Sequence, residues 1–246
     1  MNDTADRQTQ RPDGKAGGRT SPTSGSDYGE AMQDLYATRF PAEDRRSKDA
    51  VWAVLCHDFF QRYIPADGVV LDLGAGFCEF LRHIRCRRRI AVDLNPAVRD
   101  HAPAGAEVLM EACDRLTSVG DTSVDVVFAS NFFEHLPDKR TFLRTVEEVR
   151  RVLKRGGKLL VLQPNIRVVN GRYWDFVDHL IPLTDRAVAE ALELAGLSVV
   201  ECRARFLPYT TRSRWPQSPW LVRLYLRVPW VWRFLGGQAW IVGVKP

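Results

Sequence analysis

The stretch that decides the fold runs Val69-Val70-Leu71-Asp72-Leu73-Gly74-Ala75-Gly76-Phe77-Cys78-Glu79-Phe80. An apolar run that ends in one carboxylate is followed by two glycines and then by apolar residues at helical spacing. This pattern predicts a buried parallel strand, a tight turn and the start of a helix near Phe77. Glycines in such a turn let the backbone approach a ligand and supply free N–H groups at a helix N-terminus. A dinucleotide-binding fingerprint needs a third glycine where this chain has Glu79, so hydride transfer is disfavoured.

These residues resemble motif I of the class I S-adenosylmethionine (SAM)-dependent methyltransferases. In that family an acid precedes a G-x-G turn that holds the amino-acid end of the cofactor. Cys78 departs from the pattern, because many members have a third glycine at this place. The resemblance implies that Asp72, Gly74 and Gly76 contact SAM.

The length and composition fit one domain with a full hydrophobic core, since the chain has 246 residues of which 45% are hydrophobic. No run of about 18 apolar residues predicts a membrane-spanning helix, and the polar N-terminus predicts no secretory signal. The five cysteines are scattered without a C-x-x-C pair. We therefore expect neither a disulfide scaffold nor a zinc site, no metal, and a reducing cytoplasm.

Positive charge is concentrated near the C-terminus. Residues 201–246 contain eight Lys and Arg against a single acid, although the net charge of the whole chain is only +5. The rest of the chain is therefore slightly acidic. This asymmetry predicts an anionic partner near the C-terminal end.

The N-terminal residues 1–27 are polar, with almost no large apolar side chains, and predict a disordered tail. Residues 28–246 are expected to form a single methyltransferase domain with an insertion at about 207–236. Apolar residues recur at helical spacing from Asp44 to Arg62, which predicts a helix before the first strand.

A second apolar run, Ile90 to Leu94, places Asp93 about 20 residues after the glycines. In a doubly wound sheet a carboxylate there can accept both ribose hydroxyls of a nucleoside. This is the second resemblance to the family, and it also places Leu94 beside the cofactor. Residues 106–110 predict a third strand, and the resemblance implies that Asp114 then accepts from the adenine amino group. Taken alone, an Asp in a loop is more often a turn residue or a helix cap.

Residues 123–131 predict a fourth buried strand, followed by Phe132-Phe133-Glu134-His135-Leu136-Pro137-Asp138. An "EHL" turn after strand four resembles the methyltransferases that act on small molecules. Asn131 is implied at the cofactor. His135 is either a general base or a residue that packs against the adenine and orients the loop, and we favour the orienting role.

The remaining chain completes the predicted sheet. Asp138 is expected to cap a helix that Gly156-Gly157 closes, before a fifth strand at 158–163. The stretch "VLKRGGKLLVLQPN" again resembles the family. A helix that Thr184-Asp185 is expected to cap and strands at 197–206 and 237–244 follow. The resemblance implies an α/β, doubly wound, Rossmann-like fold. Its seven-stranded, mostly parallel sheet has the order 3-2-1-4-5-7-6, with strand 7 antiparallel and helices on both faces.

The segment after the fifth strand is dense in aromatic and ionisable residues, which suits a pocket wall that binds a polar ring and handles a proton. We expect Arg172, Tyr173, Trp174 and Asp175 to contact the substrate. A His near a carboxylate has the pKa range of a base, so His179 is the base candidate, oriented by Asp178 or Asp175. The alternative is that Asp178-His179 only closes the loop by hydrogen bonds.

The insertion 207–236 alternates aromatic residues with arginines. Three interpretations stay open: contact with an anionic membrane or a lipid-linked acceptor, a lid over the acceptor, or an oligomer contact. Pro229 should break any single long helix there. Nucleic acid is not expected as a partner, because no recognisable binding module is present.

The predicted activity is transfer of a methyl group from SAM to a hydroxyl of a small molecule, either a sugar or a lipid-linked glycan. A non-catalytic SAM-binding partner or regulator is the alternative. An aminopropyltransferase would need a more acidic acceptor site than Asp175 and Asp178 provide. We expect a cytoplasmic protein, with a peripheral membrane contact under the first interpretation of the insertion.

Overall fold

The central feature is a seven-stranded sheet in the order β3-β2-β1-β4-β5-β7-β6, seen in the computed structural model, which describes residues 42–209 and 218–246. Strands β1 to β5 pair in parallel, and β7 is antiparallel to both β5 and β6. This confirms the predicted fold. The predicted tail 1–27 lies outside the described residues. The strands are β1 Val69–Leu73, β2 Arg88–Val92, β3 Glu107–Leu109, β4 Val124–Ser130, β5 Leu153–Pro164, β6 Ser198–Arg203 and β7 Gln238–Val244.

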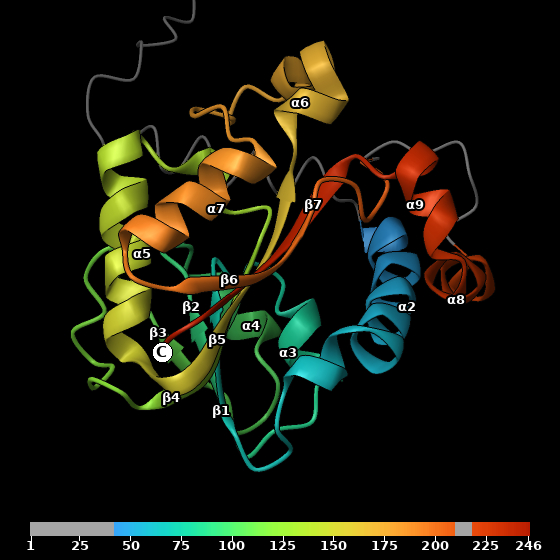
Figure 1. The fold of residues 1–246 in the computed structure, drawn as a ribbon. Coiled ribbons are helices and arrows are strands. Elements are labelled where there is room, and N and C mark those ends of the chain that lie inside the picture. The colour runs from blue at the N-terminus through green and yellow to red at the C-terminus, as the bar shows by residue number, and fades with distance from the viewer. Residues whose placement is uncertain (1–41, 210–217) are drawn as a thin grey trace, which may run out of the picture. The chain divides into compact units, whose positions relative to one another are not determined.

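Helices cover both faces of this sheet (Figure 1). Successive residues of a strand point to opposite faces, so Val69, Leu71 and Leu73 pack with α5 and α7, whereas Val70 packs with α2 and α3. The α-helices are α2 Ala42–Asp58, α3 Glu79–His83, α4 Val98–His101, α5 Lys139–Val152, α6 Ile166–Val169, α7 Asp185–Leu194, α8 Pro219–Arg227 and α9 Pro229–Leu235. The 3-10 helices are η1 Phe60–Tyr63, η2 Phe133–His135 and η3 Asn170–Asp175.

Several predicted boundaries differ from the structure, and for three of them the structure gives the reason. Helix α3 begins at Glu79, not Phe77, because Cys78 has the left-handed φ of +54° and ends the preceding turn. Strand β2 begins at Arg88 instead of Ile90, since Arg88 already pairs with Val69. Strand β5 begins at Leu153, well before the predicted residue 158, because Leu153 pairs with Val124 across a register shift in β4.

The two predicted helix caps are confirmed. The Asp138 side chain accepts a hydrogen bond from Thr141 N at 2.7 Å, and Thr184 Oγ1 accepts from Ala187 N at 3.0 Å. Both bonds satisfy a backbone donor that the first turn of a helix leaves free. These caps fix the starts of α5 and α7.

Proline divides the C-terminal insertion as predicted. Helix α8 ends at Arg227 and α9 begins at Pro229, which lacks the N–H that a continuous helix would need. Trp232 is buried, and its Nε1–H donates to Tyr225 O at 2.8 Å. The Tyr225 hydroxyl in turn donates to Phe206 O. Among the described residues, no helix combines the length and apolar character needed to cross a bilayer.

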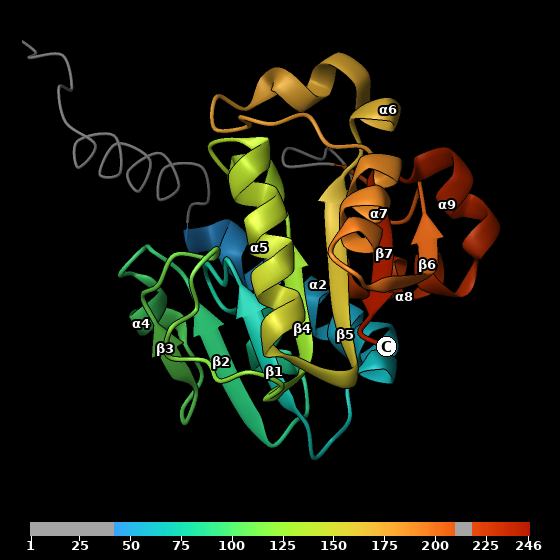
Figure 2. The ribbon, with the colours of Figure 1, turned by 60° about the vertical axis from the view of Figure 1, so that its left-hand side comes forward.

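The polar residues that were predicted to form the site lie at or beyond the carboxyl ends of the parallel strands. Figure 2 shows the arrows of β1, β4 and β5 pointing toward α6 and the segment that follows it. Open α/β sheets bind ligands outside these strand ends. The candidate site is therefore sought at this edge.

Candidate functional site

The turn after β1 uses left-handed backbone at Gly74, Gly76 and Cys78, whose φ angles are +72°, +50° and +54°. The N–H of Gly74 donates to Val92 O at 2.9 Å, and that of Gly76 donates to Asp93 Oδ2 at 2.8 Å. The prediction of free N–H groups at these two glycines is therefore wrong, because β2 and Asp93 already bind them. The hydrogen bond to Asp93 instead ties the turn to the end of β2.

The two glycines face different surroundings. A Cβ on Gly74 would lie 2.2 Å from Cδ2 of Phe132, whereas a Cβ on Gly76 would meet no atom within 4 Å. Gly74 is thus required for packing against the residue after β4. Gly76 borders open space, where a ligand can approach the backbone closely.

Gly74→Ala should lower the free energy of unfolding by about 2–4 kcal/mol, from left-handed strain and overpacking against Phe132. Gly76→Ala is the matched control, because it has the same type of strain without the clash and should cost only about 1–2 kcal/mol. Urea unfolding of both variants measures the difference. Equal losses would show that Phe132 moves aside without cost.

Carboxylates gather at this turn. Asp72 is buried at the end of β1, and burial, followed by the charges of Glu79 and Asp93, raises its pKa well above the usual range. Asp93 accepts hydrogen bonds from the N–H groups of Gly76 and Asn95, both at 2.8 Å. Burial raises the pKa of Asp93, and these bonds partly offset that effect. Burial disfavours ionisation of both carboxyl groups, and a cationic ligand beside them would favour it.

The other residues predicted at the cofactor lie on loops that follow neighbouring strands. Leu94 is 66% exposed immediately after Asp93. Asp114, after β3, forms an ion pair with Arg144 at 2.9 Å. Asn131, after β4, has a φ of +47°, and its N–H donates to Leu162 O at 2.8 Å.

A second group of polar residues joins the loop after β4 to the loop after η3. His135 Nδ1 lies 2.8 Å from Asp178 O and 3.4 Å from Asp178 Oδ2. Because a carbonyl oxygen can only accept, Nδ1 carries the proton and Nε2 of the neutral ring has a lone pair. The backbone N–H of Leu180 donates to Glu134 O at 2.8 Å. The structure thus brings the predicted residues His135 and Asp178 together.

The imidazole of His179 is buried in an aromatic setting. Its ring centroid lies 4.8 Å from that of Tyr173, 5.1 Å from that of Phe176 and 5.1 Å from that of His135. The contacts described for Asp178 orient His135, whereas the sequence predicts that Asp178 orients His179. The two imidazoles nevertheless contact each other in one cluster.

The four predicted substrate residues in η3 have different environments. Tyr173 is fully buried, and its hydroxyl donates to Ile181 O at 2.6 Å. Trp174 is 51% exposed, and Arg172 and Asp175 are exposed as well. Their roles at the substrate stay predictions.

Four residues that the sequence analysis did not select lie at this edge. Glu79 is buried beside the turn and pairs with Lys48 at 3.0 Å. Glu134 and Gln163 are buried, and no hydrogen bond of ordinary geometry reaches either side chain among the described residues, although the two are close enough for a weak one with each other. Burial, followed by the charge of Glu134, raises the pKa of Tyr209. For Glu134, the sequence feature that could have identified it is an acidic residue within an otherwise apolar turn, "FFEHL".

Residues 71–161 match the family described as "Methyltransferase domain". This match spans β1 to β5, including the turn, Asp93 and the loop after β4. No curated protein matches the chain in sequence.

Several solved structures with similar folds are described as methyltransferases. One, from Haloferax volcanii, is in a complex with the Trm112 methyltransferase activator. It is 22% identical, with a TM-score of 0.61, and the match covers 86% of this chain and 97% of that one. A SAM-dependent methyltransferase from Archaeoglobus fulgidus is 20% identical, with a TM-score of 0.58 and coverage of 79% and 93%. A third, from Thermotoga maritima, is described as a possible histamine N-methyltransferase. It is 18% identical, with a TM-score of 0.56 and coverage of 89% and 96%.

The domain match and the sheet order confirm the class I SAM-dependent methyltransferase fold and imply SAM as the cofactor. The residues of the turn fit this group. Gly76 borders open space, and the carboxyl groups of Asp72, Glu79 and Asp93 lie close enough to one another to raise the pKa of Asp72. A cofactor with a sulfonium and an ammonium group is positively charged in this region, so the charges are complementary.

Proposed function

We propose that this chain, which has the class I SAM-dependent methyltransferase fold, transfers a methyl group to a hydroxyl of a small molecule, a sugar or a lipid-linked glycan. The observation that supports it best is the imidazole pair of His135 and His179, with ring centroids 5.1 Å apart. These rings lie at the strand ends where the cofactor turn also lies. A hydroxyl acceptor must lose a proton during transfer, and imidazole is the side chain suited to that task near neutral pH.

Asp93 would hold the ribose hydroxyls, Asp114 the adenine amino group, and Asp72 and Gly76 the amino-acid end of the cofactor. SAM supplies a methyl group on a positively charged sulfur. The protein's contribution is to align the acceptor oxygen with that methyl group, because the displacement is in line.

At the acceptor end, His135 and His179 promote ionisation of the hydroxyl, and Asp178 fixes the ring of His135 through the 2.8 Å bond to its carbonyl oxygen. The exposed side chains of Arg172, Trp174 and Asp175 would contact the polar ring of the acceptor. An exposed tryptophan beside charged groups suits a sugar, since its flat face packs on the ring while the charged groups bind hydroxyls.

The surface of α8 and α9 supports contact between this protein and an anionic membrane. The protein would lie on the cytoplasmic side of that membrane, which would present the lipid-linked acceptor. Trp220, Trp230 and Phe234 are 65%, 67% and 73% exposed. Residues 219–235 contain three arginines and no acid, although Arg223 pairs with Asp58 at 2.8 Å. Exposed aromatic residues interleaved with arginines are typical of segments that lie in a bilayer interface.

We therefore expect the protein to float with vesicles that contain phosphatidylglycerol and not with vesicles of phosphatidylcholine alone. Replacement of Trp220, Trp230 and Phe234 by serine should abolish flotation, because it removes the apolar groups that enter the interface. Leu194→Ser on α7 is the control, since Leu194 is 75% exposed on a different element. Absence of flotation in the wild type would instead favour a protein partner or a second copy of the chain on this surface.

The activity is tested with purified protein, methyl-labelled SAM and a cell extract separated into lipid, nucleotide-sugar, small-molecule, protein and nucleic-acid fractions. Label in the lipid or nucleotide-sugar fraction would support the proposal, and alkaline stability of the product would distinguish an ether from an ester. Label in protein or nucleic acid would contradict it. If no fraction is labelled although S-adenosylhomocysteine binds, the alternative of a non-catalytic SAM-binding protein gains support.

A further inference from the structure

The Glu134 carboxylate is buried in an unusual environment at the end of β4. Its exposed fraction is 0%, and no hydrogen bond of ordinary geometry reaches either oxygen among the described residues, although the Gln163 side chain is close enough for a weak one. The nearby His135 Nε2 lies 3.9 Å from Glu134 Oε1, which is too long for a hydrogen bond. A carboxylate is expensive to bury in this way unless it takes up a proton or a cation compensates its charge.

The proton position on His135 makes this ring a ready ligand. Since Nδ1 donates to Asp178 O at 2.8 Å, the lone pair of the neutral ring is on Nε2, on the side of Glu134. Metal-binding histidines commonly donate their other ring N–H to a backbone carbonyl or a carboxylate, which fixes the tautomer. Asp178 offers His135 both types of oxygen, at 2.8 and 3.4 Å.

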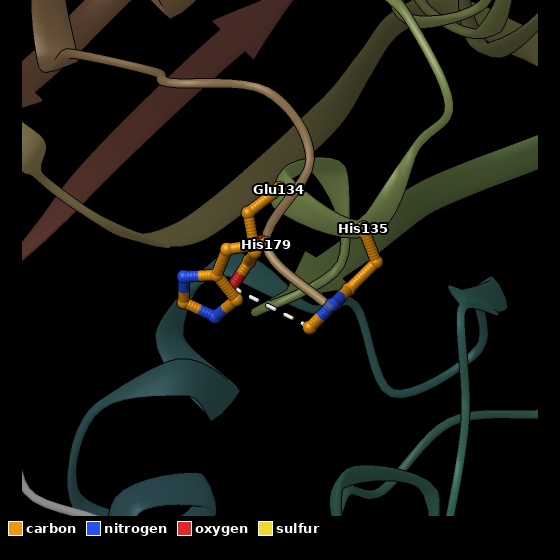
Figure 3. A group of neighbouring side chains, drawn as sticks. All are labelled: Glu134, His135 and His179. Carbon is orange, nitrogen blue, oxygen red and sulfur yellow. Dashed lines mark ion pairs between the residues drawn. The ribbon is translucent and has the colours of Figure 1, made fainter. Parts of the chain in front are cut away.

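His179 completes a set of three ligand atoms. One atom from each of Glu134, His135 and His179 lies within 4.8 Å of the others. Figure 3 shows the three side chains converging from the loop after β4 and the loop after η3. Two atoms bound to one ion at about 2.1 Å are at most about 4.2 Å apart. The separation of 3.9 Å between Glu134 and His135 already meets this limit, and a small side-chain rotation would bring in the third ligand.

We infer that Glu134, His135 and His179 bind one divalent first-row transition-metal cation at the acceptor end of the site. Two imidazoles with one carboxylate suit Mn²⁺, Fe²⁺, Co²⁺ or Zn²⁺ better than Mg²⁺ or Ca²⁺, which prefer oxygen ligands. The C-x-x-C patterns that the sequence analysis considered do not reveal such a site, because its third ligand is 44 residues beyond the second.

The inference rests on the proposed function and specifies how the histidines ionise the acceptor. A hydroxyl bound to such a cation has a lowered pKa. Its proton passes to solvent, the oxygen forms a bond to the methyl carbon as the carbon–sulfur bond of SAM breaks, and S-adenosylhomocysteine leaves. In this arrangement His179 is a ligand, not the proton acceptor that the sequence pattern predicts.

The test uses the tag-free full chain, since a histidine tag binds the same cations. After treatment with EDTA and desalting, titration calorimetry with Mn²⁺ and with Zn²⁺ should give one site per chain, and Mg²⁺ should bind more weakly. Glu134→Gln, His135→Ala and His179→Ala should each weaken binding at least tenfold. His57→Ala and Glu190→Gln are matched controls, because both residues are exposed away from the cluster. Unchanged binding of S-adenosylhomocysteine would show that each variant is folded.

Two outcomes overturn the inference: no Mn²⁺ or Zn²⁺ bound by the wild type, or equal binding by the three ligand variants and the controls. A methyl-transfer assay distinguishes failure of this inference from failure of the proposed function. Full transfer to a hydroxyl by metal-free protein would refute the role of the cation in ionising the acceptor and retain the function. Cation binding that the three variants abolish, without any transfer to a hydroxyl, would support the site and refute the function.

Discussion

Asp93→Ala should weaken SAM binding about 30-fold or more, a loss of about 2 kcal/mol. In the proposed site this carboxylate accepts the ribose hydroxyls, and hydrogen bonds to a charged acceptor are the strong ones. Asp93 also organises its own surroundings, since Oδ2 accepts from Gly76 N and Oδ1 from Asn95 N, both at 2.8 Å. Alanine removes all of these acceptors, so the cofactor loses a contact and the turn loses its tie to β2. Titration calorimetry with SAM and S-adenosylhomocysteine measures the effect.

Asp93→Asn separates the two causes. The amide keeps one oxygen that can accept from a backbone N–H but lacks the charge, so an intermediate loss of affinity is expected. Asp100→Ala is the control, because Asp100 is an exposed acid on α4. If Asp93→Ala binds SAM as tightly as the wild type, β2 does not carry the ribose contact.

The strand order follows from the family resemblance of the motifs, whereas local patterns predict the cofactor edge. Continuous apolar runs mark β1, β4 and β5 as strands buried on both faces, and an acid directly after such a run must lie at the carboxyl edge. Asp72 and Asp93 are therefore found where they were expected. The boundaries of α3 and β5 could not be predicted in this way. They depend on the left-handed backbone of Cys78 and on the pairing of Leu153 with Val124, which spacing alone does not reveal.

The acceptor end was predicted less completely, because contacts between loops distant in sequence build it. The density of aromatic and ionisable residues around His179 was sufficient to predict that this segment lines the acceptor pocket. It could not show that Asp178 orients His135, a residue 43 positions earlier in the chain. Nor could it show that Glu134 is buried without a hydrogen bond of ordinary geometry among the described residues.

His179→Ala should reduce kcat at least tenfold while the dissociation constant for SAM stays unchanged. The imidazole belongs to the acceptor end, 5.1 Å from the ring of His135, and no predicted cofactor residue is among its ring contacts. Loss of a group that ionises the acceptor lowers the rate of the chemical step by typically 100-fold or more, and a remaining His135 could retain part of that effect. Steady-state kinetics with the labelled acceptor and calorimetry with SAM measure the two quantities.

His179→Phe distinguishes chemistry from packing. Phenylalanine fills the space among Tyr173, Phe176 and His135 but has no nitrogen, so it should restore the free energy of unfolding that alanine loses without restoring turnover. His57→Ala is the control on an exposed histidine. If His179→Phe turns over like the wild type, the ring acts by packing and only closes the loop. Full turnover by His179→Ala as well would remove His179 from the mechanism and leave Glu134 and His135 to ionise the acceptor.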